Sequence, residues 1–108
     1  MELMKQQRYY LTLFVRTSPA QRKALLRTIT RPQLRALSQI AHNVIKSTVR
    51  LKPDEKKTLR RYRRIVHLLG DRKTGFETKR RAISNRTRLV YTLTSVALAY
   101  LEPVLWKN

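Results

Sequence analysis

Apolar residues recur at steps of three and four along most of the chain, the spacing that places side chains on one face of an α-helix. The clearest stripe lies within residues 31–47. Its members are Leu34, Leu37, Ile40, Ala41, Val44 and Ile45. The pattern predicts an all-α fold, a small bundle of five or six short amphipathic helices with strongly cationic outer faces.

Two tetrapeptides mark helix starts independently of that periodicity. SPAQ at 18–21 and TRPQ at 30–33 each combine a hydroxyl N-cap, a proline in the first turn and a glutamine three residues after the cap. This combination is typical of a capping box at a helix N-terminus. We therefore expect helices over 19–28 and 31–47, preceded by a further helix over 2–16.

A strongly basic helix is predicted over 53–69. Pro53 opens it, and Asp54 and Glu55 lie in its first turn, where carboxylates favour the helix dipole. Gly70 is expected to end it in a left-handed conformation. One face of this helix is apolar, while most of its other positions carry Lys or Arg.

The last part of the chain changes character. After a shorter basic helix that begins at Phe76, residues 89–101 carry no charge and are apolar nearly all round. This run is too short for a bilayer, which takes about 20 residues, so it is either central to the core or docked on another chain. We favour a helix ended by Glu102-Pro103, although its β-branched content leaves a strand open.

These elements predict one domain, in which residues 1–49 form N-terminal helices, 50–88 the densest basic helices and 89–108 an apolar helix and tail. The helical stripes would meet in a common core. Its expected members are Leu34, Leu37, Ala41, Val44, Leu59, Tyr62, Val66, Leu69, Leu93 and Ala97.

Charge narrows the range of functions. The 108 residues contain 25 Lys/Arg and 6 Asp/Glu, a formal net charge of +19. Residues 50–88 hold fifteen Lys/Arg and four acids, a net +11, and residues 1–49 hold nine against one, a net +8. So large an excess of one sign indicates a polyanionic partner. We expect nucleic acid rather than a membrane surface, because the cations are spread over several segments and many are Arg, which suits phosphate.

Two sets of residues are assigned from this distribution. The expected phosphate-binding residues are Lys56, Lys57, Arg60, Arg61, Arg63, Arg64, Lys79, Arg80, Arg81, Arg86 and Arg88. A homo-oligomer is expected to form through Leu89, Leu93, Val96, Leu98 and Tyr100. Many cations with few amide or hydroxyl base readers favour sequence-independent binding of double-stranded DNA, and no aromatic platform for RNA stands out.

Catalysis has little support in the sequence. There is no cysteine, and two histidines and six scattered acids leave almost nothing from which to build a metal centre. We expect no enzyme activity, no metal and no cofactor. The N-terminus lacks the pattern of a signal peptide, which indicates an intracellular protein or one packaged in a particle.

Several motifs in the middle of the chain occur in a recognisable order. They are the helix segment 40–45, the entry 49–59 with its proline, the segment 69–73 and the basic cluster 79–81. In this order they resemble the PX-like small basic core proteins of adintoviruses and Polinton-type elements, named after adenovirus core peptide X (mu). The resemblance covers about residues 25–83; the family's glycine pair and proline-rich tail are replaced here by an apolar segment. It implies a histone-like protein that coats and condenses double-stranded DNA in the virion core and host nucleus, with a capsid-protein contact as a further expectation.

Two other interpretations stay open. The chain could be a structural RNA-binding or capsid-lining protein in an intracellular particle rich in nucleic acid. A helix-turn-helix regulator is a weaker alternative, because the helix after the 49–53 connection carries Lys and Arg where a base reader would show Asn, Gln or Ser.

Overall fold

The computed structural model describes residues 5–46 and 50–106, with side chains described up to residue 99. Seven helices make up this part of the chain, and it contains no strand. They are α2 (Arg8–Arg16), α3 (Pro19–Arg27), α4 (Arg31–Ile45), α5 (Pro53–Arg61), α6 (Arg63–Gly70), α7 (Phe76–Ile83) and α8 (Thr87–Trp106). The all-α prediction is confirmed, and the segment 89–101 is helical rather than a strand.

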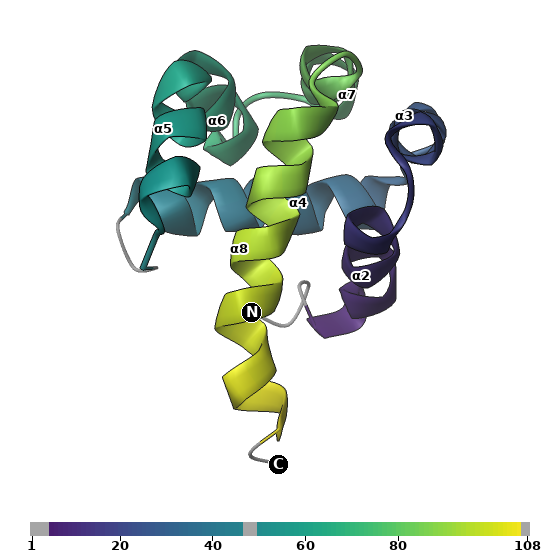
Figure 1. Ribbon diagram of the computed structural model, residues 1–108. Helices are drawn as coiled ribbons and strands as arrows, with labels where there is room; N and C mark the ends of the chain where they lie inside the picture. The colour runs from purple at the N-terminus through teal and green to yellow at the C-terminus, as the bar shows by residue number, and fades with distance from the viewer. Residues whose placement is uncertain (1–4, 47–49, 107–108) are drawn as a thin grey trace.

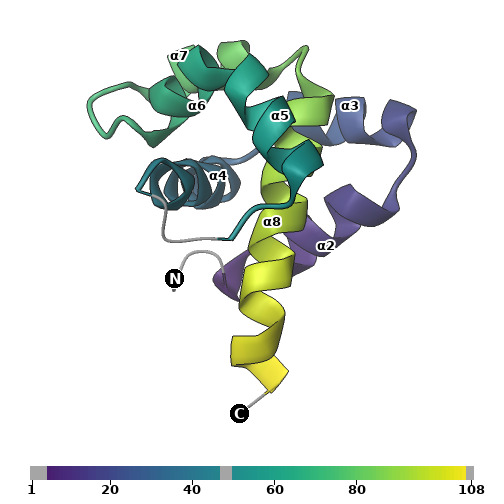
Figure 2. The same cartoon turned by 60° about the vertical axis from the view of Figure 1, so that its left-hand side comes forward.

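Helix α8 runs through the middle of the molecule, and α4 crosses it (Figure 1). Helices α2 and α3 lie on one side of α8, whereas α5 and α6 lie on the other (Figures 1 and 2). The most extensive packing joins α4 to α6 and α2 to α8. In the part of the chain described, no helix has the length and hydropathy needed to cross a membrane.

The core is largely the predicted one. Eight of the ten predicted positions are buried, and the other two, Val44 and Tyr62, are half-buried and pack against the same cluster. The prediction missed contributions from α2, α3 and α7. Fully buried residues there are Leu11, Phe14, Leu26 and Ile83. Helix α2 therefore supplies part of the core in which α8 is packed.

Both predicted capping boxes are present. The Gln21 backbone N–H donates to Ser18 Oγ over 3.3 Å, and the Ser18 N–H donates to Gln21 Oε1 over 3.2 Å. The Thr30 N–H likewise donates to Gln33 Oε1 over 2.9 Å. These reciprocal bonds satisfy N–H groups that the first helical turn leaves without partners, and so fix where α3 and α4 begin.

The single helix predicted over 53–69 is wrong. The backbone turns at Tyr62 (φ −105°, ψ 27°) and divides the segment into α5 and α6, so that there are seven helices instead of five or six. The turn gives the two halves different partners: α5 packs against α8, and α6 packs against α4. Leu59 on α5 and Leu69 on α6 are both buried in the common core.

The end predicted for the last helix is also wrong. Helix α8 continues through Glu102 and Pro103 to Trp106. Proline removes one backbone hydrogen bond and one donor from a helix. Because Pro103 lies in the last turn of α8, only the end of the helix loses a hydrogen bond, while core packing stabilises the earlier turns.

Gly70 serves a different purpose from the one predicted. It is the last residue of α6 and does not adopt a left-handed conformation; the chain leaves the helix at Asp71 (φ −82°). A Cβ atom at Gly70 would lie 3.0 Å from Ile45 Cδ1 and 3.3 Å from the backbone N and Cα of His42. The absence of a side chain therefore lets α6 approach the backbone of α4 closely.

Replacing Gly70 by valine is expected to lower the free energy of unfolding by about 2 kcal/mol, because the larger side chain must push α6 away from α4. Urea denaturation monitored by circular dichroism would measure the loss. Gly75→Ser is the matched control: a Cβ there meets nothing within 4 Å, and serine is a good N-cap for α7. Equal stability of the two variants would contradict this role for Gly70.

Candidate nucleic-acid interface

The densest group of exposed cations lies on α5 and α6. The apolar residues Leu59, Val66 and Leu69 turn inward to the core, which leaves the basic positions of both helices facing outward. We call these exposed residues the α5–α6 basic face. It consists of Lys56, Lys57, Arg60, Arg61, Arg63 and Arg64. All six are among the residues predicted to bind phosphate.

None of the six cations of this face forms an ion pair with an acid of the described residues. Within residues 5–46 and 50–99, the one ion pair joins Arg80 to Glu77, on a different helix. Glu55 lies close in sequence, but its carboxylate accepts the backbone N–H of Lys52 over 2.8 Å at the start of α5. The basic face therefore presents positive charge to solvent at short spacing, which attracts an extended anion.

Part of this face borders a groove between α5 and α8. The groove has a volume of about 670 Å³, and Lys57, Arg61 and Arg88 line it together with Asp54 and Glu55. The Arg61 guanidinium lies over the Tyr62 ring, 5.6 Å from its centroid. The fold thus brings Arg88 next to two basic-face residues from which it is distant in sequence.

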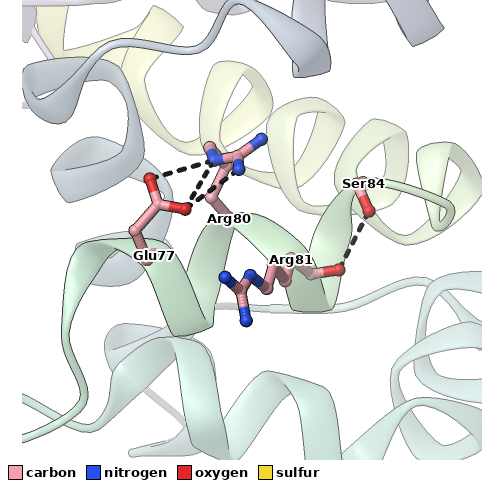
Figure 3. Close-up of polar contacts among 4 residues, drawn as sticks. All are labelled: Glu77, Arg80, Arg81 and Ser84. Atoms are coloured by element: carbon pink, nitrogen blue, oxygen red, sulfur yellow. Dashed lines mark hydrogen bonds and ion pairs between the residues drawn. The ribbon is translucent and has the colours of Figure 1, made fainter.

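The predicted cluster on α7 is divided by the structure. Arg81 is exposed, whereas the guanidinium of Arg80 binds Glu77, with Nη2 2.9 Å from Oε2, and points away from Arg81 (Figure 3). The hydrogen bond from Arg80 holds the pKa of Glu77 below its usual value. Arg86 is half-buried and its guanidinium donates to the Ala82 carbonyl. Arg80 and Arg86 are therefore already engaged within the chain.

Lys79 differs from the exposed residues predicted to bind phosphate, because it is buried in the fold. Its side chain is only 8% exposed, and its ammonium group donates to Ser38 Oγ on α4 over 3.2 Å. Burial lowers the pKa of Lys79. A duplex lying on the outside of the molecule could not reach this ammonium group directly.

The predicted self-association surface is wrong for its main residues. Leu89 and Leu93 are fully buried and Val96 is 3% exposed, so these side chains are packed inside their own chain. Leu98 is half-buried against the same core. The side chain of Tyr100 lies outside the described residues. The apolar run is central to the core, which was one of the two roles that its sequence allowed.

Sequence reasoning also missed a structural arginine. Arg22 Nε donates to the Phe14 carbonyl and its Nη2 to the Val15 carbonyl, both over 2.8 Å. Its guanidinium lies 4.2 Å from the centroid of the Tyr91 ring. Arg22 thus caps the C-terminus of α2 and joins α3 to α8, an arrangement that only the tertiary fold reveals.

A second basic region was missed as well. Arg31, Arg35 and Arg72 line a cavity together with Lys79. The i, i+4 spacing of Arg31 and Arg35 was the available sequence signal, because it places both on one face of a helix. Nothing in the sequence indicated that the loop carrying Arg72 would fold onto that face.

Comparison with known proteins gave no matching family model, no matching curated protein and no matching solved structure. The resemblance to PX-like core proteins therefore stays a prediction made from the residues of this chain.

Proposed function

We propose that this protein binds double-stranded DNA without sequence preference and neutralises its phosphates, so that it coats and condenses the duplex. The observation that carries the proposal is the α5–α6 basic face, whose six exposed cations have no ion-pair partner among the described residues. Each cation that meets a phosphate releases a condensed counterion, which supplies the binding free energy.

The size of the molecule suits this role. The fold measures 36 × 26 × 26 Å, and a duplex carries about one charge per 1.7 Å, so a length equal to the protein carries about 15 to 21 negative charges. The net charge of the chain is +19. One molecule can therefore neutralise a stretch of duplex about as long as itself.

The chemistry of the basic face favours the backbone over the bases. Sequence readout needs side chains such as Asn, Gln or a bidentate Arg placed against particular base edges in the major groove. The six cations of the basic face are spread over two helices that meet at the turn at Tyr62, so they do not lie along one straight helix. Such a surface supports contacts with phosphates along the strand better than insertion of one helix into a groove.

Condensation requires that one protein molecule contact two duplexes. A second group of exposed cations, on α2 and α3, could make the second contact. Arg16, Lys23 and Arg27 are exposed on α2 and α3, and we call them the α2–α3 basic face. Helices α2 and α3 lie across α8 from α5 and α6 (Figure 1). Two basic faces on opposite sides would let a single chain join neighbouring duplexes, without the self-association first expected of α8. Together with the PX-like resemblance, this favours a core protein of a virion, acting there and in the host nucleus.

Equilibrium binding across a salt series tests the proposal. Unrelated duplexes should bind with equal affinity at a given salt concentration, and the slope of log affinity against log salt should be about −5 if the six residues of the α5–α6 basic face each contact one phosphate. Single- and double-stranded RNA are the comparison ligands. A marked preference for structured RNA would support an RNA-binding or particle-lining protein instead, and one preferred DNA sequence with a shallow slope would support a regulator.

A further inference from the structure

A cavity of about 480 Å³ lies between α4, the loop 71–75 and the first turns of α7, and none of the residues of the two basic faces lines it. Four cationic side chains line it: Arg31 and Arg35 from α4, Arg72 from the loop and Lys79 from α7. No carboxylate is among its lining residues. A concave site with one sign of charge concentrates the field and so favours an anionic ligand.

Lys79 is the feature that distinguishes this cavity from an exposed basic surface. Lys79 is only 8% exposed, and its ammonium group has three donors, one of which donates to Ser38 Oγ. No carboxylate of the described residues lies within 4 Å of it. The acid of the loop, Asp71, acts on Lys79 only through its charge, which raises the pKa of Lys79 against the larger effect of burial. Its carboxylate accepts the Lys73 N–H over 3.0 Å and the Thr74 hydroxyl over 3.1 Å.

A buried cation with so little compensation costs free energy. Burial accordingly lowers the pKa of Lys79. An anion in the cavity would add a counter-charge closer than Asp71 and acceptors for the remaining donors. Arg35 and Arg72 are both exposed at the cavity, so their guanidinium groups can also meet an incoming phosphate.

The cavity is larger than a phosphate group requires, and part of its wall is apolar. Its volume lies in the range of about 300 to 1,000 Å³ that is usual for small-molecule sites. Leu34 and Phe76 line it, and the Arg31 guanidinium lies 4.6 Å from the centroid of the Phe76 ring. An aromatic ring beside an arginine offers a planar ligand a stacking surface next to the phosphate-binding groups.

We propose that this cavity is a nucleotide-binding site, in which Lys79, Arg35 and Arg72 bind the phosphate and Leu34 and Phe76 contact the base. The nucleotide can be free or can be the terminal nucleotide of a strand, since the two share this chemistry. The site uses none of the residues of the two basic faces, so nucleotide binding here does not depend on whether the chain condenses DNA.

The test is a titration of the ¹⁵N-labelled full chain with deoxyadenosine monophosphate, followed by amide chemical shifts. Saturable shifts are expected at Ser38, Gly70 and Thr74, with an affinity about tenfold above that of inorganic phosphate, because stacking of one base contributes about 1–3 kcal/mol. Shifts spread over α5 and α6, or equal affinity for phosphate alone, would overturn the proposal.

Two variants make the test specific to the cavity. Lys79→Gln should weaken nucleotide binding about tenfold or more, because the charge-assisted hydrogen bonds are lost. Arg72→Gln, an exposed change in the loop, should weaken it while leaving the fold intact, and so covers the case in which the Lys79 variant is unstable. Lys57→Gln on the α5–α6 basic face is the matched control and should bind as the parent does. The assignment would be overturned if the Arg72 variant bound the nucleotide as the parent does and the Lys79 variant, folded stably, did so too.

Single strands with and without a 5′-phosphate separate the two sources of the nucleotide. Shifts at the same amides that require the 5′-phosphate would identify a strand end as the ligand. Shifts there with the mononucleotide but with neither strand would identify a free nucleotide. Duplex affinity of the Lys79 and Arg72 variants should be nearly unchanged, so that failure of duplex binding and failure of this site are recorded separately.

Discussion

Glutamine in place of the four arginines of the α5–α6 basic face should weaken duplex DNA binding about a thousandfold near 0.15 M salt. Each arginine that contacts a phosphate releases about 0.9 of a counterion, so the salt slope should become shallower by about 3.6 when four contacts are removed. The loss should be similar for unrelated sequences, because no base is read. Fluorescence anisotropy across a salt series measures both quantities.

The three residues of the α2–α3 basic face provide the matched control when they too are changed to glutamine. These residues are also exposed cations, and their helices lie on the other side of α8. If that face serves to bridge duplexes, its loss should reduce DNA condensation, seen by light scattering, more than it reduces binding to one short duplex. An equal loss of affinity per charge removed from either face would show that binding follows net charge alone and would remove the special role of α5 and α6.

The same substitutions should leave the fold intact. All four arginines are exposed and without acidic partners among the described residues, and changes at such positions usually alter stability by less than about 0.5 kcal/mol. Removal of like charges can even stabilise so basic a chain. A thermal melt of each variant therefore separates a loss of DNA contacts from a loss of structure.

Local chemistry explains which parts of the fold could be predicted. The capping boxes at Ser18 and Thr30 involve residues within three positions of one another, so their sequence alone indicates where α3 and α4 begin. Apolar residues at helical spacing similarly identified most of the core contributed by α4, α5 and α6. These signals do not depend on how the helices pack.

Features that depend on packing were missed for a physical reason. Apolar residues keep helical spacing throughout residues 53–69, so the sequence does not show the turn at Tyr62. The turn goes with the different neighbours of α5 and α6. Gly70 resembles a helix cap in the sequence, but the structure requires a glycine there because the backbone of His42 lies too close for a side chain. The helices that pack on α5 and α6, and the His42 backbone next to Gly70, are all distant from these positions in the sequence.

The candidate site shows the same division. Lys79 and Arg81 belong to one basic cluster in the sequence, yet Lys79 contacts Ser38, 41 residues away, while Arg81 faces solvent. A count of charges treats the two residues alike. Only the packing of α7 on α4 distinguishes a cation that can meet an external phosphate from one that lines a cavity.

Leu93→Asp is expected to abolish the folded state in the absence of DNA. Leu93 is 0% exposed and lies inside the core that α8 shares with α2 and α4. An unpaired carboxylate there would cost about 4–5 kcal/mol or more, close to the whole stability of a small domain. Far-ultraviolet circular dichroism and thermal melting measure the loss. Ala99→Asp, at an exposed position of the same helix, is the control and should melt near the parent temperature.

The same variant also tests whether folding and polyanion binding are linked. A ligand that binds only the folded state stabilises it by about 4 kcal/mol when present at a thousand times its dissociation constant. Duplex DNA should therefore restore part of the helical signal of Leu93→Asp if the basic faces bind the folded chain. A variant that melts like the parent without DNA would instead contradict the central position of α8. Because α8 contacts helices on both sides of the molecule, the two basic faces would then lose the element that holds them apart.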